Sequence, residues 1–143
     1  DSLLMGTDPD YTLVLDLWGE TQPFWEKRQG YLNTPFIWCS LLNFGGKLNN
    51  WGRIDTLAAQ PYRVLRSPYA KLLKGIGAIP EGDATNIVNF DFLFEEAWST
   101  EPLQAAAWFE KYPAIRYGKA DTSATKAWKW LYTHVYNSPM GSY

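Results

Sequence analysis

The chain has 143 residues, a length that suits one domain but is too short for a complete eight-stranded βα barrel of roughly 250 residues. Its 46% hydrophobic and 20% charged residues are typical of a globular protein. The net charge of −2 leaves no basic surplus for a phosphate backbone, so we expect no nucleic-acid partner. No apolar run approaches the ~18 residues of a membrane span, so we expect none.

Three nearly continuous apolar runs occupy residues 12–18, 35–42 and 72–79. Such short runs are typical of strands buried on both faces of a parallel sheet. The interval between the second and third runs leaves room for a crossover helix, in which Ile54, Leu57 and Ala58 have helical spacing and Pro61 is expected to end the pattern. The interval between the first two runs is tighter for a crossover.

The pattern becomes helical after Gly82. A helix capped by Asn86 would carry Ile87, Phe90, Phe94 and Ala97 on one face. A second helix is expected from 103 to 112, kinked or ended by Pro113, with Gly118 as a stop. The last helix would begin at Asp121 or Thr122 and carry an apolar stripe of Ala124, Ala127, Trp128, Leu131 and Val135. The sequence thus predicts an α/β part followed by helices, with a boundary near residues 99–101.

Aromatic residues are abundant: the chain has eight Trp, nine Tyr and seven Phe. One interpretation is a large apolar core, since each ring buries a large area. The other is a carbohydrate site, where aromatic faces stack on sugar rings. The count alone favours the core.

Two carboxylates come directly after predicted strands. Glu20 follows the first run, and Glu81 follows the third in the segment Ile79-Pro80-Glu81-Gly82. Parallel sheets place their sites at the carboxyl ends of strands. Glycoside cleavage needs two carboxyl groups, about 5–5.5 Å apart in retaining enzymes and about 6.5–9.5 Å apart in inverting ones. The alternative is that each glutamate caps a helix or faces solvent.

The stretch from Trp38 to Gly46 contains further candidates. Asn43 at a strand end could hydrogen-bond a sugar hydroxyl or cap the turn. The only cysteine, Cys39, excludes a disulfide within the chain. The only histidine, His134, is expected on a distant helix, so we interpret Cys39 as a small buried apolar residue. Gly45-Gly46-Lys47 is not a phosphate loop, because Leu48 stands where Ser or Thr is required.

Several blocks taken together resemble the α-N-acetylglucosaminidases of glycoside hydrolase family 89. The segment 13–23 (LVLDLWGETQP) resembles one stretch of that family, and Pro35-Phe36-Ile37-Trp38-Cys39 with Asn43-Phe44-Gly45-Gly46 resembles its most recognisable block. Gly75-Ile76-Gly77-Ala78-Ile79-Pro80-Glu81-Gly82 resembles its nucleophile motif. Later blocks, among them Arg116-Tyr117-Gly118 and Val135-Tyr136-Asn137, fit the start of its helical domain. The blocks follow the family order over nearly the whole chain.

This resemblance implies a fold and an activity. The fold would be α/β, with the C-terminal part of a (β/α)8 TIM-type barrel in residues 1–100 and the first helices of an all-α domain in residues 101–143. The activity would be that of a retaining exo-hydrolase that releases terminal α-linked N-acetylglucosamine from glycans or glycosaminoglycans of the heparan-sulfate type. No metal or organic cofactor is implied. A lysosomal or secreted location is implied, and a homo-oligomer is allowed.

The resemblance also assigns residues. It implies that Glu81 is the catalytic nucleophile and that the acid/base is a glutamate upstream of this chain, in a remainder of the barrel that would complete the site. Glu20 then becomes a residue that contacts the substrate or supports those that do. Trp38, Cys39 and Asn43 are the other substrate-binding candidates.

Two positions depart from the family pattern. Family members commonly carry His where this chain has Leu42, and another His is frequent near Leu48. These changes leave Glu81 in place. They support an alternative function, in which the chain belongs to a catalytically impaired relative that binds glycan or serves as a structural subunit.

Overall fold

The structure is a computed structural model that describes residues 2–41, 52–81 and 87–137. The chain divides into two compact units. The first comprises Asp1–Leu48 and Ala59–Thr85, and the second comprises Asn49–Ala58 and Asn86–Tyr143. Each unit is described by itself.

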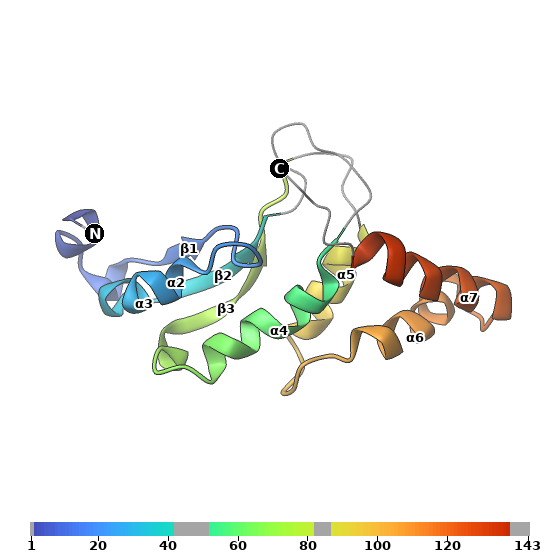
Figure 1. Cartoon of the computed structure of the whole chain (residues 1–143). Helices are drawn as coiled ribbons and strands as arrows, with labels where there is room; N and C mark the ends of the chain where they lie inside the picture. The colour runs from blue at the N-terminus through green and yellow to red at the C-terminus, as the bar shows by residue number, and fades with distance from the viewer. Residues whose placement is uncertain (1, 42–51, 82–86, 138–143) are drawn as a thin grey trace. The chain divides into compact units, whose positions relative to one another are not determined.

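Within the described residues of the first unit, one sheet contains the strands β1 (Val14–Asp16), β2 (Phe36–Ser40) and β3 (Leu73–Ala78) (Figure 1). All neighbours are parallel, in the order β1-β2-β3. Asp16 pairs with Trp38, and Ser40 pairs with Ala78. The three apolar runs are therefore strands, and the predicted parallel α/β sheet is confirmed.

Short helical turns flank the sheet in this unit: α1 (Ser2–Met5), η1 (Pro9–Tyr11), α2 (Phe24–Lys27), α3 (Gln29–Asn33) and η2 (Ala70–Leu72). Trp25 of α2 and Tyr31 of α3 are buried, and the Tyr31 ring meets Phe36 of β2 edge-on, with 5.6 Å between centroids. Residues 29–33 all have positive φ, between 50° and 67°. This left-handed turn closes the short connection from β1 to β2.

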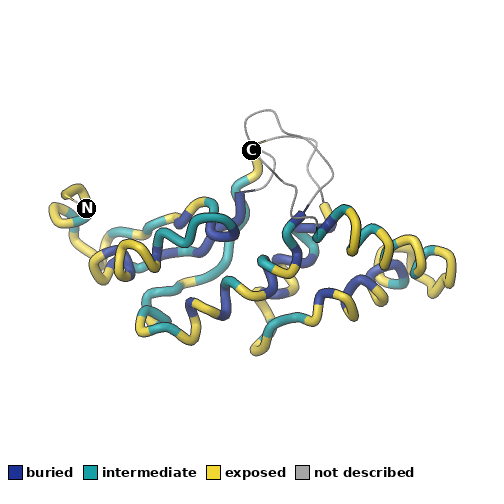
Figure 2. Tube along the Cα trace, viewed as in Figure 1, coloured by how far each residue is buried: buried dark blue, intermediate teal, exposed yellow. Residues whose placement is uncertain are grey.

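The two faces of the sheet differ in burial. Figure 2 colours each described residue along the chain by its exposure. Because successive side chains of a strand point to opposite faces, Asp16 and Trp38 share one face, and both are at most 1% exposed. Leu15 lies on the other face and is 51% exposed. On that face a Cβ added at Gly75 would meet nothing within 4 Å. The face of Asp16 and Trp38 therefore carries α2 and α3, and the opposite face is open at Leu15.

The connection from β2 to β3 contains the predicted crossover helix, α4 (Ile54–Leu65). The expectation that Pro61 ends the helix is wrong, since the helix continues through it. A proline inside a helix loses one hydrogen bond and costs about 3 kcal/mol. The buried side chains on both sides of it, Leu57 at 0% and Val64 at 0% exposure, supply the packing that offsets this cost.

The second unit contains α5 (Ile87–Glu96), α6 (Ala105–Tyr117), α7 (Thr122–Leu131) and the short π-helix η3 (Tyr132–Tyr136). Aromatic rings form its core. The rings of Phe92 and Trp108 meet edge-on at 5.1 Å, those of Trp108 and Tyr112 stack at 4.5 Å, and those of Phe109 and Tyr136 lie 5.8 Å apart. In this unit the aromatic residues therefore form an apolar core, the first of the two interpretations of the composition.

Some helical expectations are confirmed and others are wrong. Gly118 ends α6 with φ 72°, and Asp121 caps α7 by accepting a hydrogen bond from the Ala124 N–H. Of the two effects expected of Pro113, a kink or an end, the end is excluded, because Pro113 lies inside α6, where it and its neighbour Tyr112 are buried. The expected stripe of α7 is only half-buried at best, and Ala127 is exposed.

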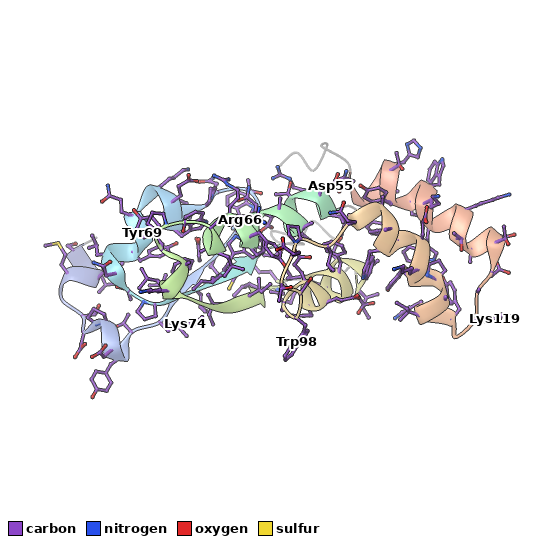
Figure 3. All side chains as sticks on the ribbon, turned by 90° about the horizontal axis from the view of Figure 1, so that it is seen from below. Asp55, Arg66, Tyr69, Lys74, Trp98 and Lys119 are labelled. Carbon is purple, nitrogen blue, oxygen red and sulfur yellow. The ribbon has the colours of Figure 1, made fainter. Side chains whose placement is uncertain are left out.

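The buried face of α5 also differs from the expected one. Val88, Phe92 and Leu93 are buried, whereas Ile87 is 51% and Phe94 is 47% exposed. The sequence of α5 is apolar on nearly all sides, so periodicity alone did not select the packed face. Beyond α5, Trp98 is 90% exposed, and its side chain projects away from the ribbon in Figure 3. None of the described helices combines the length and the apolar character that a membrane crossing requires.

Candidate active site at the carboxyl ends of the strands

The chain leaves β1 in a sharp turn. Trp18 has φ 70°, and its carbonyl accepts hydrogen bonds from the N–H groups of Thr21 and Gln22 at 3.0 and 2.8 Å. The Gly19 N–H donates to the Cys39 carbonyl at 2.9 Å, which extends the ladder between β1 and β2. A Cβ at Gly19 would lie 2.4 Å from the Trp38 indole, so the close approach requires glycine.

Glu20 is 2% exposed and lies at the end of β2. Its Oε1 and Oε2 accept the Leu41 N–H at 3.0 and 3.2 Å. A buried carboxylate needs such a donor, because burial without hydrogen bonds is costly. Glu20 therefore neither caps a helix nor faces solvent. It binds the backbone at the end of the neighbouring strand.

Trp38 and Cys39 of β2 are both interior residues, 0% and 2% exposed. The Cys39 thiol lies 3.6 Å from the Ile37 carbonyl. Burial raises the pKa of Cys39 to about 11, with the charges of Asp16 and Glu20 acting in the same direction. The thiol is therefore protonated at neutral pH, which agrees with its interpretation as a small buried residue and not a nucleophile.

Glu81 follows β3 and is exposed. The Ile79 N–H donates to the Ser40 carbonyl at 2.9 Å, so the backbone stays in register with β2 until two residues before Glu81. Because the strands are parallel, their carboxyl ends lie at the same end of the sheet. Glu20 follows β1 and Glu81 follows β3, so both lie beyond that end. Asn43, Leu42 and Leu48 lie outside the described residues.

The sequence interpretation missed Asp16, which is 1% exposed within the first apolar run. Its Oδ2 accepts the Trp25 N–H at 3.2 Å, which attaches α2 to the sheet, and burial raises its pKa. A carboxylate inside an apolar run was the available signal.

In the part of the chain that the structure describes, no group of three His, Cys, Asp or Glu side chains is arranged to hold a metal ion.

At the carboxyl ends of the strands, the site thus combines the exposed carboxylate of Glu81 with the buried, hydrogen-bonded carboxylate of Glu20.

Two family models match the chain. The one described as the alpha-N-acetylglucosaminidase (NAGLU) TIM-barrel domain covers residues 1–100, and the one described as the alpha-N-acetylglucosaminidase (NAGLU) C-terminal domain covers residues 108–143. The chain belongs to the alpha-N-acetylglucosaminidase family. The resemblance seen in the sequence is thereby confirmed.

Individual relatives agree with this assignment. The human alpha-N-acetylglucosaminidase is 36% identical over 126 residues, which are 87% of this chain and 17% of that protein. A family 89 glycoside hydrolase from Clostridium perfringens in complex with PUGNAc has a TM-score of 0.84 and 32% identity, and the match covers 99% of this chain. A second Clostridium perfringens structure is a variant with two glutamates replaced by glutamine, in complex with its substrate GlcNAc-alpha-1,4-galactose. It has a TM-score of 0.79 and 32% identity, and the match covers 91% of this chain.

The chain spans only a small share of these relatives. It covers 17% of the human protein, and 16% and 14% of the two bacterial chains.

Proposed function

We propose that this chain supplies the nucleophile part of a retaining exo-hydrolase that releases terminal α-linked N-acetylglucosamine from glycans or glycosaminoglycans of the heparan-sulfate type. The observation that carries this proposal is the exposed Glu81 directly after β3, within the part of the chain that the barrel model of the family matches. In the proposed architecture, residues 1–100 are the C-terminal part of the barrel and residues 101–143 begin an all-α domain. The lysosomal or secreted location stays a prediction.

The proposed reaction has two steps. The ionised Glu81 carboxylate attacks the anomeric carbon while a carboxylic acid from the remainder of the barrel protonates the departing glycosidic oxygen. This forms a covalent glycosyl–Glu81 ester and releases the aglycone. The second carboxyl group, now a carboxylate, takes a proton from water, whose oxygen attacks the same carbon and releases the sugar and free Glu81. Two inversions give net retention of the α configuration.

The substrate complex of the bacterial relative supports a mechanism with two carboxyl groups. That protein holds GlcNAc-alpha-1,4-galactose as a variant with two Glu→Gln replacements. Glutamine keeps the shape of glutamate but has no ionisable carboxyl group, so a glycoside can stay intact beside it. In our proposal, Glu81 is one of the two corresponding groups of this family member.

The other assigned residues take supporting places in this proposal. Trp38, Cys39 and Glu20 are buried, so in this proposal they support the site from within the fold and do not form its open surface. Asn43 is proposed to hydrogen-bond a sugar hydroxyl. Leu42 and Leu48, where His is common in the family, favour the alternative of a catalytically impaired, glycan-binding relative.

The Glu81→Gln variant of the complete protein tests the proposal. We expect kcat for an aryl α-N-acetylglucosaminide to fall by at least about 10⁴-fold, because the amide cannot act as the nucleophile. Glu26→Gln is the matched control, since Glu26 is an exposed glutamate of the same unit that pairs with Arg63 at 2.9 Å on the surface. Its kcat should stay unchanged.

The identity of the first product anomer tests the stereochemistry. Proton NMR of the wild-type reaction should show α-N-acetylglucosamine before mutarotation. Turnover by the Glu81→Gln variant at the wild-type rate would refute the nucleophile assignment. A wild-type protein that binds the glycoside without cleaving it would support the impaired relative.

A further inference from the structure

One peptide group connects the ends of all three strands. The peptide between Ser40 and Leu41 donates its N–H to the Glu20 carboxylate at 3.0 and 3.2 Å. Its carbonyl oxygen accepts the Ile79 N–H at 2.9 Å on the opposite side. Since a peptide group is planar and rigid, fixing its N–H also fixes the direction of its C=O.

The turn after β1 explains why a carboxylate stands at this point. The backbone turns out of the sheet at Trp18, and the Gly19 N–H makes the last described backbone-to-backbone bond from this segment to β2. The next N–H on that side of β2, that of Leu41, then needs an acceptor. The Glu20 side chain supplies it, in the place where a further β1 carbonyl would have stood.

The acceptor is a buried carboxylate and not a neutral carbonyl. Charge-assisted hydrogen bonds are roughly twice as strong as neutral ones, and Glu20 is only 2% exposed. A strong acceptor on the N–H also polarises the peptide and strengthens its C=O as an acceptor. The bond from the Ile79 N–H to the Ser40 carbonyl gains from this arrangement.

The chain from Ile79 to Glu81 has little freedom. Pro80 has a fixed φ, and it restricts the backbone of Ile79 to extended conformations. The direction in which Glu81 leaves the sheet is therefore set largely at Ile79.

We propose that Glu20 is a positioning residue, which orients Glu81 through the Ser40–Leu41 peptide and Ile79 without contacting the sugar. The proposal rests on the proposed function for the reaction that it serves. A misplacement of about 1 Å at a reacting group can cost about 10²-fold in rate, so the loss of this support should appear in kcat.

Two substitutions of the complete protein separate reach from charge. Glu20→Asp keeps the charge but is one methylene too short to reach the Leu41 N–H, and we expect kcat to fall about 10- to 100-fold with KM within about threefold. Glu20→Gln keeps both the length and an acceptor oxygen, and we expect its kcat to stay within about fivefold of wild type. The substrate is the same aryl α-N-acetylglucosaminide.

Asp16→Asn is the matched control. Asp16 is also a buried carboxylate that accepts a backbone N–H, but that N–H belongs to Trp25 in α2 and leads away from Glu81. Its kcat should equal that of wild type once folding is confirmed by thermal unfolding. If Glu20→Asp does not fold, Glu20→Gln decides alone: a fall in kcat beyond fivefold would contradict the expectation that the acceptor oxygen and length suffice.

Amide hydrogen exchange gives a readout that does not depend on activity. The Ile79 amide should exchange at least about tenfold faster in Glu20→Asp than in wild type, and close to the wild-type rate in Glu20→Gln. An unchanged Ile79 rate in Glu20→Asp overturns the proposal, even if the wild-type protein proves inactive and the proposed function fails. A raised KM with normal kcat would assign Glu20 to sugar contact. A loss of kcat in Glu20→Gln with a normal kcat in Glu20→Asp would assign the effect to its charge. Either result overturns the proposal.

Discussion

Single atoms decide how the end of β1 meets β2. A Cβ at Gly19 would lie 2.4 Å from Cε2 and Nε1 of Trp38, whose side chain is 0% exposed and has no space to move into. We expect Gly19→Ala to destabilise the protein by about 1–3 kcal/mol, as overpacking does elsewhere. Thermal or urea unfolding of the complete protein measures this change.

Gly6→Ala is the control for this substitution. A Cβ at Gly6 would have ordinary contacts of 3.6 and 3.8 Å with backbone oxygens, so its unfolding free energy should change by less than about 0.5 kcal/mol. Equal stability of the two alanine variants would show that Trp38 yields.

At this scale the sequence located carboxylates but not their partners. Glu20 and Glu81 were found because each follows an apolar run, and a strand end is a local pattern. The bond from Leu41 to Glu20 joins residues 21 apart in sequence, and it depends on the register of two strands. The burial of Trp38 beneath Gly19 depends on the same register, so neither could be predicted from residue types alone.

Among the helices, one buried carboxyl group makes stability depend on pH. Glu96, the last residue of α5, is 2% exposed, and its Oε2 accepts the Leu103 N–H at 3.2 Å in the link to α6. Burial raises the pKa of Glu96 to about 7, while the bond from Leu103 lowers it. Between about pH 4.5 and pH 7, the Glu96 carboxyl group is therefore protonated in the folded state and ionised in the unfolded state, whose pKa is near 4.5.

The direction of the pH effect follows from this difference. The contribution of Glu96 to the free energy of unfolding is fully present below pH 4.5. It is lost as pH rises through about 7, by up to about 3 kcal/mol. We expect the melting temperature of the wild type to fall relative to that of Glu96→Gln between pH 5 and pH 8. Glutamine retains an acceptor for Leu103 but cannot ionise. If the melting temperatures of the two proteins changed equally with pH over this range, the raised pKa of Glu96 would be contradicted.

The helices also show which signals are local. The cap at Asp121 and the stop at Gly118 were readable because each depends on one or two backbone groups. Pro61 was misread as an end, because a local pattern does not show how deeply the side chains around it, Leu57 and Val64, are buried. The packed face of α5 was misread because apolar residues surround the helix.

For the whole molecule, the open face and edge of the sheet are the decisive features. Leu15 of β1 and its flanking residues Leu13 and Leu17 are 51%, 52% and 42% exposed. Within the described residues β1 pairs only with β2, so its other edge leaves backbone groups without strand partners. The chain spans 17% of its human relative. From these observations we predict that further barrel strands of the complete protein cover this face.

This leads to opposite expectations for one substitution in two contexts. Expressed alone, the 143-residue chain should show no hydrolase activity, bind a hydrophobic dye and self-associate, because apolar side chains and a strand edge are open. Leu15→Lys should reduce dye binding and self-association of the isolated chain by placing a charge on the open face. In the complete protein the same lysine would be buried without a partner, so it should lower stability by several kcal/mol and abolish activity. Dye fluorescence, light scattering and unfolding curves of both forms measure these effects.

Two outcomes would contradict this expectation. A complete protein that tolerates Leu15→Lys would show that this face is not covered by the remainder of the barrel, and an active isolated chain would show that no remainder is needed.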